Sequence, residues 1–326
     1  MLKPQAKGQA LISVALASYN GEKYLREQLD SIYAQTYPNI EVVACDDGSK
    51  DGTLGILRDY QKKFGLKLYS NEKNLGFKQN FAKSVSLCSG SLIALCDQDD
   101  IWYPQRLESL STAMGDRLAV FCGSDLIDEE GKIVQRGYKA FERNFDIGFE
   151  ELLYNNFSPG AFMLCRAEVL HRNIPIPESE RYHDWYWMKR LSAEGKVAFV
   201  DTVLMQYRRH ASVQTTIVDI PKTLKAAFRK LAITEDTLSF YRDFFSLQVR
   251  QLKGMSADAR YTQEQSIAIC EALDLFSYLS GESSNWLRGE VKFALKIGKI
   301  FPDLSPANRF GKYLRYHLVR ARITKA

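Results

Sequence analysis

Long hydrophobic runs are missing from this sequence, and none approaches the ~18 residues that a membrane-spanning helix requires. The first ten residues, MLKPQAKGQA, are too polar for a signal peptide. The six cysteines include no CxxC pair and mostly lie in apolar segments, which argues against a disulfide framework and against a zinc site. With 45% hydrophobic and 25% charged residues among 326, the chain is expected to be an ordinary globular protein of the cytoplasm.

The net charge is +5, and its basic part is concentrated at the C-terminus. Residues 286–326 contain ten Lys and Arg against two acidic residues, a local net charge of +8 that leaves −3 for the rest. Apolar and basic residues recur there at helical spacing, which predicts basic amphipathic helices able to lie on an anionic membrane surface. The alternative is a helical subdomain that packs on the rest of the chain or on a second subunit. Motifs of nucleic-acid-binding modules are missing, so no nucleic-acid partner is expected.

Up to about residue 215, short β-rich apolar runs alternate with amphipathic stretches, the pattern of a sheet with crossover helices. Beyond Pro221 the signals are helical, with a capping box at Thr262 to Gln265 and a stop at Gly281. We therefore expect an α/β domain over residues 1–218 and a helical, basic domain over residues 219–326. The expected strands are 11–17, 40–45, 66–69, 91–96, 161–166 and 197–201, the expected helices 22–35, 53–64 and 77–87, and the expected hairpin turn 128–132.

Polar residues follow three of the expected strands. They are Ser18, Tyr19 and Asn20 with nearby Glu22 after the first strand, Asp46 to Ser49 after the second, and Asp97 to Asp100 after the fourth. Open α/β sheets bind ligands at the carboxyl ends of their strands, so these groups are expected to share one rim. The alternative is that Asp, Asn, Gly and Ser only form turns and helix caps.

The run Asp97, Gln98, Asp99, Asp100 is the strongest candidate site, because carboxylates this close repel one another and a divalent cation such as Mg²⁺ or Mn²⁺ relieves that repulsion. Asp46 and Asp47 are suited to accept hydrogen bonds from a nucleobase or ribose. Three further polar residues, Asn74, Lys78 and Asn80, surround the start of a helix whose N–H groups suit an anionic ligand.

Asp184 is flanked by His183, Trp185 and, two positions further on, Trp187, in a chain with four Trp. A carboxylate beside aromatic rings suits a sugar site, where the acid can take a hydroxyl proton. The alternative is a helix whose Trp side chains face the core. A second cluster, Arg208, Arg209 and His210, could place two cations and an imidazole against a diphosphate or a metal, or be a solvated basic loop.

Five segments occur in a fixed order: SVALASYNGEKYLREQLDSIYAQTYPNIEVVACDDGSKDGT, NLGFKQNFAKS, LIALCDQDDIWYP, the acid of HDW, and YRRH. In this order they resemble the family-2 glycosyltransferases over roughly residues 11–215. The resemblance implies the GT-A fold, a mixed, mostly parallel sheet flanked by helices, here followed by a mostly α-helical extension. NGEKYLREQLDSI and HDWYW are most similar to bacterial rhamnosyltransferase-type members.

The resemblance implies an inverting transfer of a sugar, with L-rhamnose from dTDP-rhamnose as the expected donor, to a hydroxyl of a glycan or lipid-linked glycan in cell-surface polysaccharide synthesis. It implies Asp184 as the base, Asp46 or Asp47 as the nucleobase contact, Asp97 at the ribose, and Asp99 with His210 at Mg²⁺ or Mn²⁺. His183 stands where the family has an acid. Such an enzyme would act on the cytoplasmic face of the inner membrane. The alternatives are a transferase that uses a UDP-linked glucosyl, galactosyl or N-acetylhexosaminyl donor, and a non-catalytic nucleotide-sugar-binding scaffold.

Overall fold

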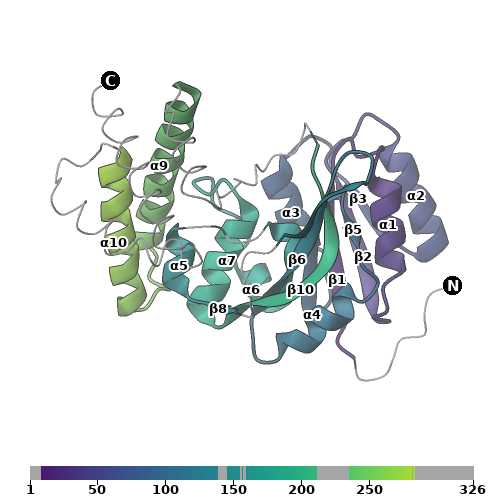
Figure 1. Cartoon of the computed structure of the whole chain (residues 1–326), viewed down its shortest axis with the longest axis horizontal. Coiled ribbons are helices and arrows are strands. Elements are labelled where there is room, and N and C mark those ends of the chain that lie inside the picture. The colour runs from purple at the N-terminus through teal and green to yellow at the C-terminus, as the bar shows by residue number, and fades with distance from the viewer. Residues whose placement is uncertain are drawn as a thin grey trace. The chain divides into compact units, whose positions relative to one another are not determined.

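The computed structural model describes residues 9–138, 145–154, 156, 159–210, 235–280 and 282, drawn as a ribbon in Figure 1. Its strands form one ten-stranded sheet. They are β1 (Ile12–Ser18), β2 (Ile40–Asp46), β3 (Lys67–Ser70), β4 (Leu92–Cys96), β5 (Ile101–Trp102), β6 (Ala119–Ile127), β7 (Ile133–Tyr138), β8 (Phe145–Ile147), β9 (Met163–Arg166) and β10 (Val197–Arg208). The helices are α1 (Leu25–Tyr33), α2 (Thr53–Phe64), α3 (Phe77–Ser86), α4 (Arg106–Met114), α5 (Phe149–Tyr154), α6 (Ala167–Arg172), α7 (His183–Glu194), α9 (Glu235–Ser256) and α10 (Gln263–Ser280), with a 3-10 turn η1 (Gly160–Phe162).

The sheet has a parallel half and a mixed half. β3, β2, β1 and β4 are neighbours in that order and all run parallel. β9 enters antiparallel between β4 and β6, β6 pairs with β10 in parallel, and β5 ends the path antiparallel to β10. β7 adds to β6 and β8 adds to β10. The α/β sheet with flanking helices expected from the sequence is therefore confirmed.

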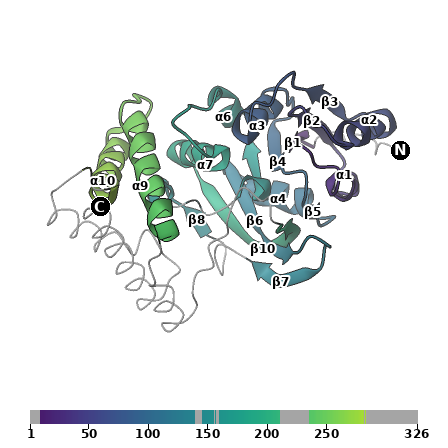
Figure 2. The same ribbon diagram turned by 90° about the horizontal axis from the view of Figure 1, so that it is seen from above.

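Helices lie on both faces of this sheet. Figure 2 shows α3, α6 and α7 on one side and α1 and α4 on the other. Because β4 and β6 are covered on both faces, all of their residues are buried, and their sequences are nearly continuous apolar runs. The amphipathic helices contribute one apolar face each, such as Leu25, Leu29 and Ile32 of α1.

Most of the elements expected from the sequence are found within one or two residues of their predicted ends. α2 has the predicted bounds, and the capping box is present, since Thr262 N donates to Gln265 Oε1 at 3.0 Å and Gln265 N to Thr262 Oγ1 at 3.2 Å. The predicted strand 197–201 is too short, because β10 continues to Arg208 through register shifts between Val200 and Met205. All six cysteines are free; five are buried and Cys270 is exposed.

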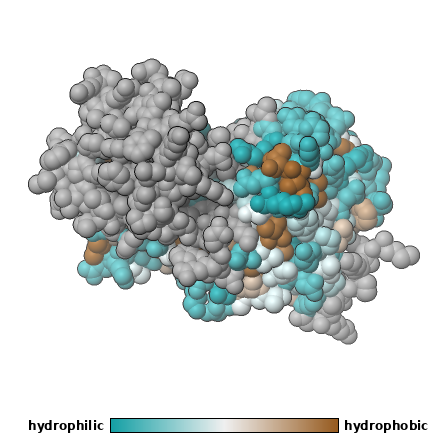
Figure 3. All heavy atoms as spheres, in the orientation of Figure 1, coloured by the Kyte–Doolittle hydropathy of each residue, from teal (hydrophilic) through white to brown (hydrophobic). Residues whose placement is uncertain are grey.

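The chain divides into two compact units, of which the first carries the sheet. The second consists of residues 149–155, 178–181 and 215–326, and within it the Tyr154 ring of α5 lies 6.1 Å from that of Phe276 in α10. The predicted boundary at 218/219, Pro221, Gly281 and the basic tail lie outside the described residues. Among the described helices, none is both long and apolar enough to cross a bilayer. On the face drawn in Figure 3, the described residues are mostly hydrophilic, with hydrophobic residues at several places.

Candidate active site

The sheet register aligns the carboxyl ends of three parallel strands. Ser18, the last residue of β1, is paired with Asp46, the last residue of β2, and Leu16 is paired with Cys96 at the end of β4. Asp97 therefore leaves the sheet beside the residues that follow Leu16. The polar groups that the sequence places after these strands lie along one edge, as in other open α/β sheets.

Asp46 organises the turn after β2. Its carboxylate is fully buried and accepts hydrogen bonds from Gly48 N at 3.2 Å, from Ser49 N at 2.9 Å, and from the hydroxyls of Ser49 and Ser18. Each carboxylate oxygen thus has two donors from the protein. Of the two neighbouring acids, Asp46 has no acceptor capacity left for a ligand, so its place is structural.

Asp47 holds the loop between β3 and α3. Its Oδ1 accepts from Asn71 Nδ2 at 2.7 Å and Leu75 N at 2.8 Å, and its Oδ2 accepts from Gly76 N at 2.9 Å. The side chain is 2% exposed, and Oδ2 retains one free acceptor position. Asp47 is therefore the better placed of the pair for a further hydrogen bond.

The other polar residues of this loop mainly bind protein groups. Asn74 Oδ1 accepts from Gly76 N at 3.0 Å, and Asn80, 2% exposed, donates to Cys45 O at 2.9 Å. Lys78 Nζ donates to Pro177 O at 3.1 Å. The structure brings Asn74 and Asn80 to the β2 turn, whereas the Lys78 ammonium is directed to the segment before α7.

The turn after β1 is tied to the loop after β4. Tyr19 N donates to Gln98 Oε1 at 2.8 Å, and Gln98 Nε2 donates back to Tyr19 O at 3.1 Å. Asn20 has a positive φ of 49°, and its N–H donates to Ser49 Oγ at 2.9 Å. Glu22 Oε2 accepts from Gly52 N at 2.8 Å. The Tyr19 ring is 46% exposed.

Carboxylates from two distant parts of the chain, the loop after β4 and the start of α7, share one electrostatic environment. Burial, followed by the negative charges of Asp99 and Asp184, raises the pKa of the Asp97 carboxyl to about 8. Burial also raises the pKa of Asp100 well above its usual range, with Asp99 and Asp97 adding to the effect. The structure thus brings the start of α7 to the loop after β4, and concentrates negative charge where a cation or a cationic partner would be stabilised.

Asp99 and His210 form the pair best suited to a divalent metal. His210 Nε2 lies 3.0 Å from Asp99 Oδ2, with the side chains 11% and 20% exposed. A carboxylate oxygen suits Mg²⁺ or Mn²⁺, and a neutral imidazole nitrogen is a common metal ligand. Within the described ranges, no group of three or more His, Cys, Asp or Glu side chains could hold a metal. The residues present therefore fit a metal that takes its remaining ligands from substrate phosphates and water, as Mg²⁺ commonly does.

Arg208 does not face a ligand, which corrects the interpretation of its side chain as a diphosphate contact. The guanidinium is buried, donates to the Asp99, Asp128 and Glu129 carbonyls at 2.8 to 3.2 Å, and pairs with Glu27 Oε2 at 2.5 Å. Arg208 therefore holds the loop after β4 through the backbone carbonyl of Asp99. Arg209, by contrast, is exposed, and its N–H donates to Ile127 O at 2.8 Å.

Asp184 sits at the first turn of α7 and is 5% exposed. Its Oδ2 accepts from Gly160 N at 3.1 Å and its Oδ1 from Trp185 N at 2.6 Å, which fixes the orientation of the carboxylate. His183 is 7% exposed, stacks on Phe81 with ring centroids 4.1 Å apart, and has no hydrogen-bond partner on either ring nitrogen among the described residues. Burial lowers the pKa of His183, opposed by the Asp184 charge.

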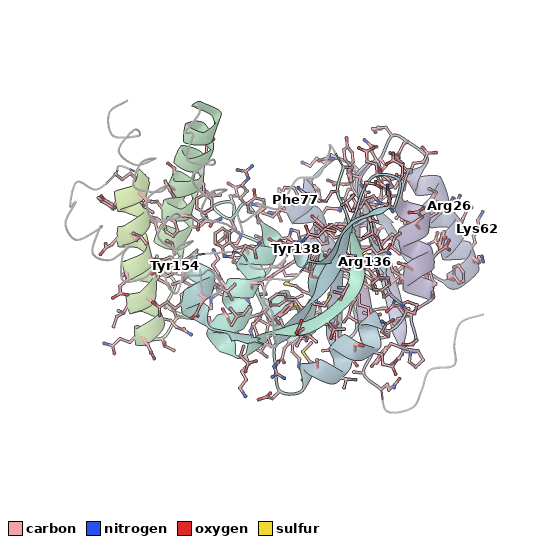
Figure 4. All side chains as sticks on the ribbon, in the orientation of Figure 1. Arg26, Lys62, Phe77, Arg136, Tyr138 and Tyr154 are labelled. Atoms are coloured by element: carbon pink, nitrogen blue, oxygen red, sulfur yellow. The ribbon has the colours of Figure 1, made fainter. Side chains whose placement is uncertain are left out.

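The two tryptophans of HDWYW do not expose their rings beside Asp184, which corrects the expectation that they form part of a sugar site. Trp187 is fully buried and Trp185 is 3% exposed, so α7 turns these rings into the core, where burial of large aromatic surface is favourable. The open ring beside His183 is Phe77, which is 37% exposed with its centroid 6.1 Å from that of His183. Figure 4 labels Phe77 at the start of α3.

Sequence reasoning missed two supporting residues. Gly160 donates its N–H to Asp184, and a Cβ at this position would lie 2.9 Å from His183 Nε2, so only glycine fits without displacement. Arg106 is a fully buried cation on α4. The sequence signal for Gly160 is the Pro159-Gly160 pair, which is typical of a turn, and the signal for Arg106 is its closeness in sequence to Asp100.

Comparison with known proteins agrees with this geometry. The model of the family described as glycosyl transferase family 2 matches residues 13–173. An uncharacterized glycosyltransferase of Haemophilus influenzae is 26% identical, with 92% of this chain and 96% of that protein covered. One of Rickettsia prowazekii is 30% identical, with 63% of this chain and 66% of that protein covered.

Solved structures share the fold at low sequence identity. Staphylococcus aureus TarS 1-349 in complex with UDP has a TM-score of 0.61 at 19% identity, covering 96% of this chain and 91% of that one. A mannosyltransferase of Pyrobaculum calidifontis, in complex with GDP-Man and Mn²⁺, has a TM-score of 0.54 at 15% identity, covering 97% and 87%. The fold is therefore of the GT-A type. Together with the aligned strand ends and their acidic residues, these matches show that the chain belongs to the family-2 glycosyltransferases.

Proposed function

We propose that this protein is an inverting, metal-assisted glycosyltransferase that moves a sugar from a nucleotide donor to a hydroxyl of a glycan or lipid-linked glycan. The observation that carries the proposal is that Asp97, Asp99 and Asp184 lie near enough for their charges to interact, with His210 Nε2 3.0 Å from Asp99 Oδ2. One oriented carboxylate and one separate pair of metal ligands are the groups that a single displacement needs.

In this proposal Asp184 takes the proton of the acceptor hydroxyl as that oxygen attacks the anomeric carbon. Gly160 N and Trp185 N each hold one of its oxygens, so the carboxylate is oriented before substrate arrives. A single displacement, in which the acceptor oxygen replaces the nucleoside diphosphate, inverts the anomeric configuration, and no covalent glycosyl-enzyme is required. Asp184→Asn should abolish transfer with nucleotide affinity nearly unchanged, and wild-type turnover in this variant would remove Asp184 from the role.

The donor nucleotide would lie along the same edge. Asp47 Oδ2, with its free acceptor position, is the proposed nucleobase contact, and Asp97 the ribose contact. Asp99 and His210 would hold the metal. When bound, a divalent cation there supplies the positive charge that the departing nucleoside diphosphate requires.

For the sugar, we propose L-rhamnose from dTDP-rhamnose, because HDWYW and NGEKYLREQLDSI are most similar to rhamnosyltransferase-type members. A UDP-linked donor is the second candidate, since the TarS fold was solved with UDP and with UDP-GlcNAc. Calorimetry and thermal shift with dTDP, UDP and GDP, each with and without Mn²⁺ or Mg²⁺, separate the two, because a ligand of the native state raises its apparent stability. Metal-dependent stabilisation by dTDP supports a dTDP-rhamnose donor. Stabilisation by UDP or GDP instead overturns the rhamnose assignment, and no response to any of the three nucleotides favours a non-catalytic protein.

We further propose that the basic segment 286–326 attaches the protein to the cytoplasmic face of an anionic membrane, where lipid-linked acceptors are found. Its +8 charge supports this, at roughly 1 kcal/mol per basic residue near the lipid. Truncation after Ser280 should release the protein from vesicles containing anionic lipid, and binding of the full chain should weaken as salt is raised. Vesicle binding that does not change with salt concentration would contradict the proposal.

A further inference from the structure

Arg106 is a cation with no access to solvent. It begins α4, is 0% exposed, and its guanidinium carbon lies 4.0 Å from the centroid of the Trp102 ring. Its Nη1 lies 3.7 Å from Met205 Sδ, and its Nε has no hydrogen-bond partner among the described residues. A buried cation that is only partly paired costs free energy, so an apolar residue of the same shape would often serve stability better. The Asp100 carboxyl lies near enough to interact with this charge, so Arg106 has an electrostatic partner as well as the hydrogen bond described next.

The one strong hydrogen bond of Arg106 goes to the backbone that supports Asp184. Arg106 Nη2 donates to Ala161 O at 2.6 Å, and Ala161 belongs to the 3-10 turn η1. The residue before it, Gly160, donates its N–H to Asp184 Oδ2 at 3.1 Å. Two adjacent residues of turn η1 therefore link Arg106 to Asp184. Ala161 O accepts from Arg106, and Gly160 N donates to the Asp184 carboxylate.

Turn η1 is also tightly fitted against α7. An added Cβ on Gly160 would lie 2.9 Å from His183 Nε2 and 3.2 Å from Asp184 Cβ. Because the Gly160 backbone lies this close to α7 and bonds to Asp184, we expect a displacement of η1 to shift the Asp184 carboxylate. Arg106 is the described side chain that ties this turn to α4, on the opposite face of the sheet from α7.

From this geometry we propose that Arg106 is a positioning residue, which fixes turn η1 so that Gly160 N holds the Asp184 carboxylate in the orientation needed for proton removal. The inference rests on the proposed function, in which Asp184 is the base. Arg106 does not touch the substrate in this account; it acts through Ala161 and Gly160.

Arg166, which is only partly buried, offers a control for the loss of side-chain bonds to backbone carbonyls. Like Arg106 it spans from side chain to backbone carbonyls, with Nη2 2.6 Å from Gly115 O and Nε 3.3 Å from Arg117 O. Those carbonyls belong to the loop after α4, at the amino ends of the strands, away from Asp184. Arg166→Met therefore removes the same kind of bond without touching η1.

The test compares Arg106→Met, Arg106→Lys and Arg166→Met. Hydrogen–deuterium exchange of peptides spanning residues 159–165 should quicken in Arg106→Met and stay at wild-type rates in Arg166→Met. Turnover of the donor identified in the nucleotide screen should fall in kcat by on the order of 10²-fold, with the Kd of the matching nucleoside diphosphate unchanged. Arg106→Lys, which keeps a donor and a charge, should recover part of the loss.

Unchanged exchange at residues 159–165 in a folded Arg106→Met variant would overturn the inference whether or not the protein transfers sugar. So would an equal fall in kcat for Arg166→Met. If Arg106→Met does not fold, the same two readouts on Arg106→Lys decide, and wild-type values for both would overturn the inference. If the wild type shows no turnover but exchange at residues 159–165 still depends on Arg106, the proposed function is overturned. The link between Arg106 and η1 through Ala161 O would remain supported.

Discussion

Asp47 should be one of the costliest polar residues to replace. Asp47→Asn keeps one carbonyl oxygen, which can still accept from Asn71 Nδ2 and Leu75 N, but it turns an amide NH₂ toward Gly76 N, which donates to the native Oδ2 at 2.9 Å. The hydrogen bonds from Asn71 and Leu75 therefore lose their charged acceptor, and the Gly76 N–H faces another donor. Since hydrogen bonds to charged groups contribute about 1.5–3 kcal/mol, we expect a loss of roughly 2–3 kcal/mol in the free energy of unfolding.

Urea denaturation followed by circular dichroism measures this loss, provided that the m-value stays constant. Asp47→Ala, which removes all three bonds, should be less stable than Asp47→Asn. The matched control is Asp59→Asn, because Asp59 is 61% exposed and pairs with Arg26 at 3.2 Å, a contact worth about 0.2–1 kcal/mol. The reasoning fails if Asp47→Asn costs no more than Asp59→Asn.

Three further predictions concern other parts of the first unit. Burial lowers the pKa of His183, so below pH ~6.5 the unfolded chain binds a proton that the folded chain does not. As the pH is lowered, the melting temperature should therefore fall less steeply in His183→Gln than in the wild type. Parallel slopes of melting temperature against pH would contradict this. Gly90→Ala should cost about 2 kcal/mol, because the new Cβ would lie 2.6 Å from Leu11 O, whereas Gly55→Ala, in open space within α2, should be neutral or stabilising in the same urea titration. Asp99→Asn should abolish the Mn²⁺-dependent part of the thermal shift caused by a nucleoside diphosphate and retain the metal-independent part; an undiminished Mn²⁺ effect would exclude Asp99 as a ligand.

The parts of the fold that could be predicted are those governed by local periodicity. The helix expected over residues 53–64 is found with those ends, and the polar residues after β1, β2 and β4 fall on one edge because parallel strands present the same end together. β9 could not be placed in this way, since a short apolar run does not reveal that it pairs antiparallel between β4 and β6.

The direction of each side chain is the harder part of the site to predict. The sequence patterns place both Arg208 and Trp187 against ligands, yet Arg208 binds backbone carbonyls below the carboxylate loop and Trp187 is fully buried. Whether a residue of an amphipathic helix or a strand end faces the core or the site depends on what packs against it from far along the chain. Asp99 and His210, 111 positions apart, meet only because β10 runs on past its predicted end to the loop after β4.

The two ends of the main strand path bear on how the protein behaves at high concentration. β3 has four residues, begins with Lys67, and that lysine pairs with Glu41 of β2 at 2.6 Å; β5, at the other end, has only two. Short terminal strands with a charged side chain are poor templates for adding a strand from another molecule. At these two ends the sheet is therefore a poor template for edge-to-edge polymerisation, which matters for the concentrated samples that calorimetry requires.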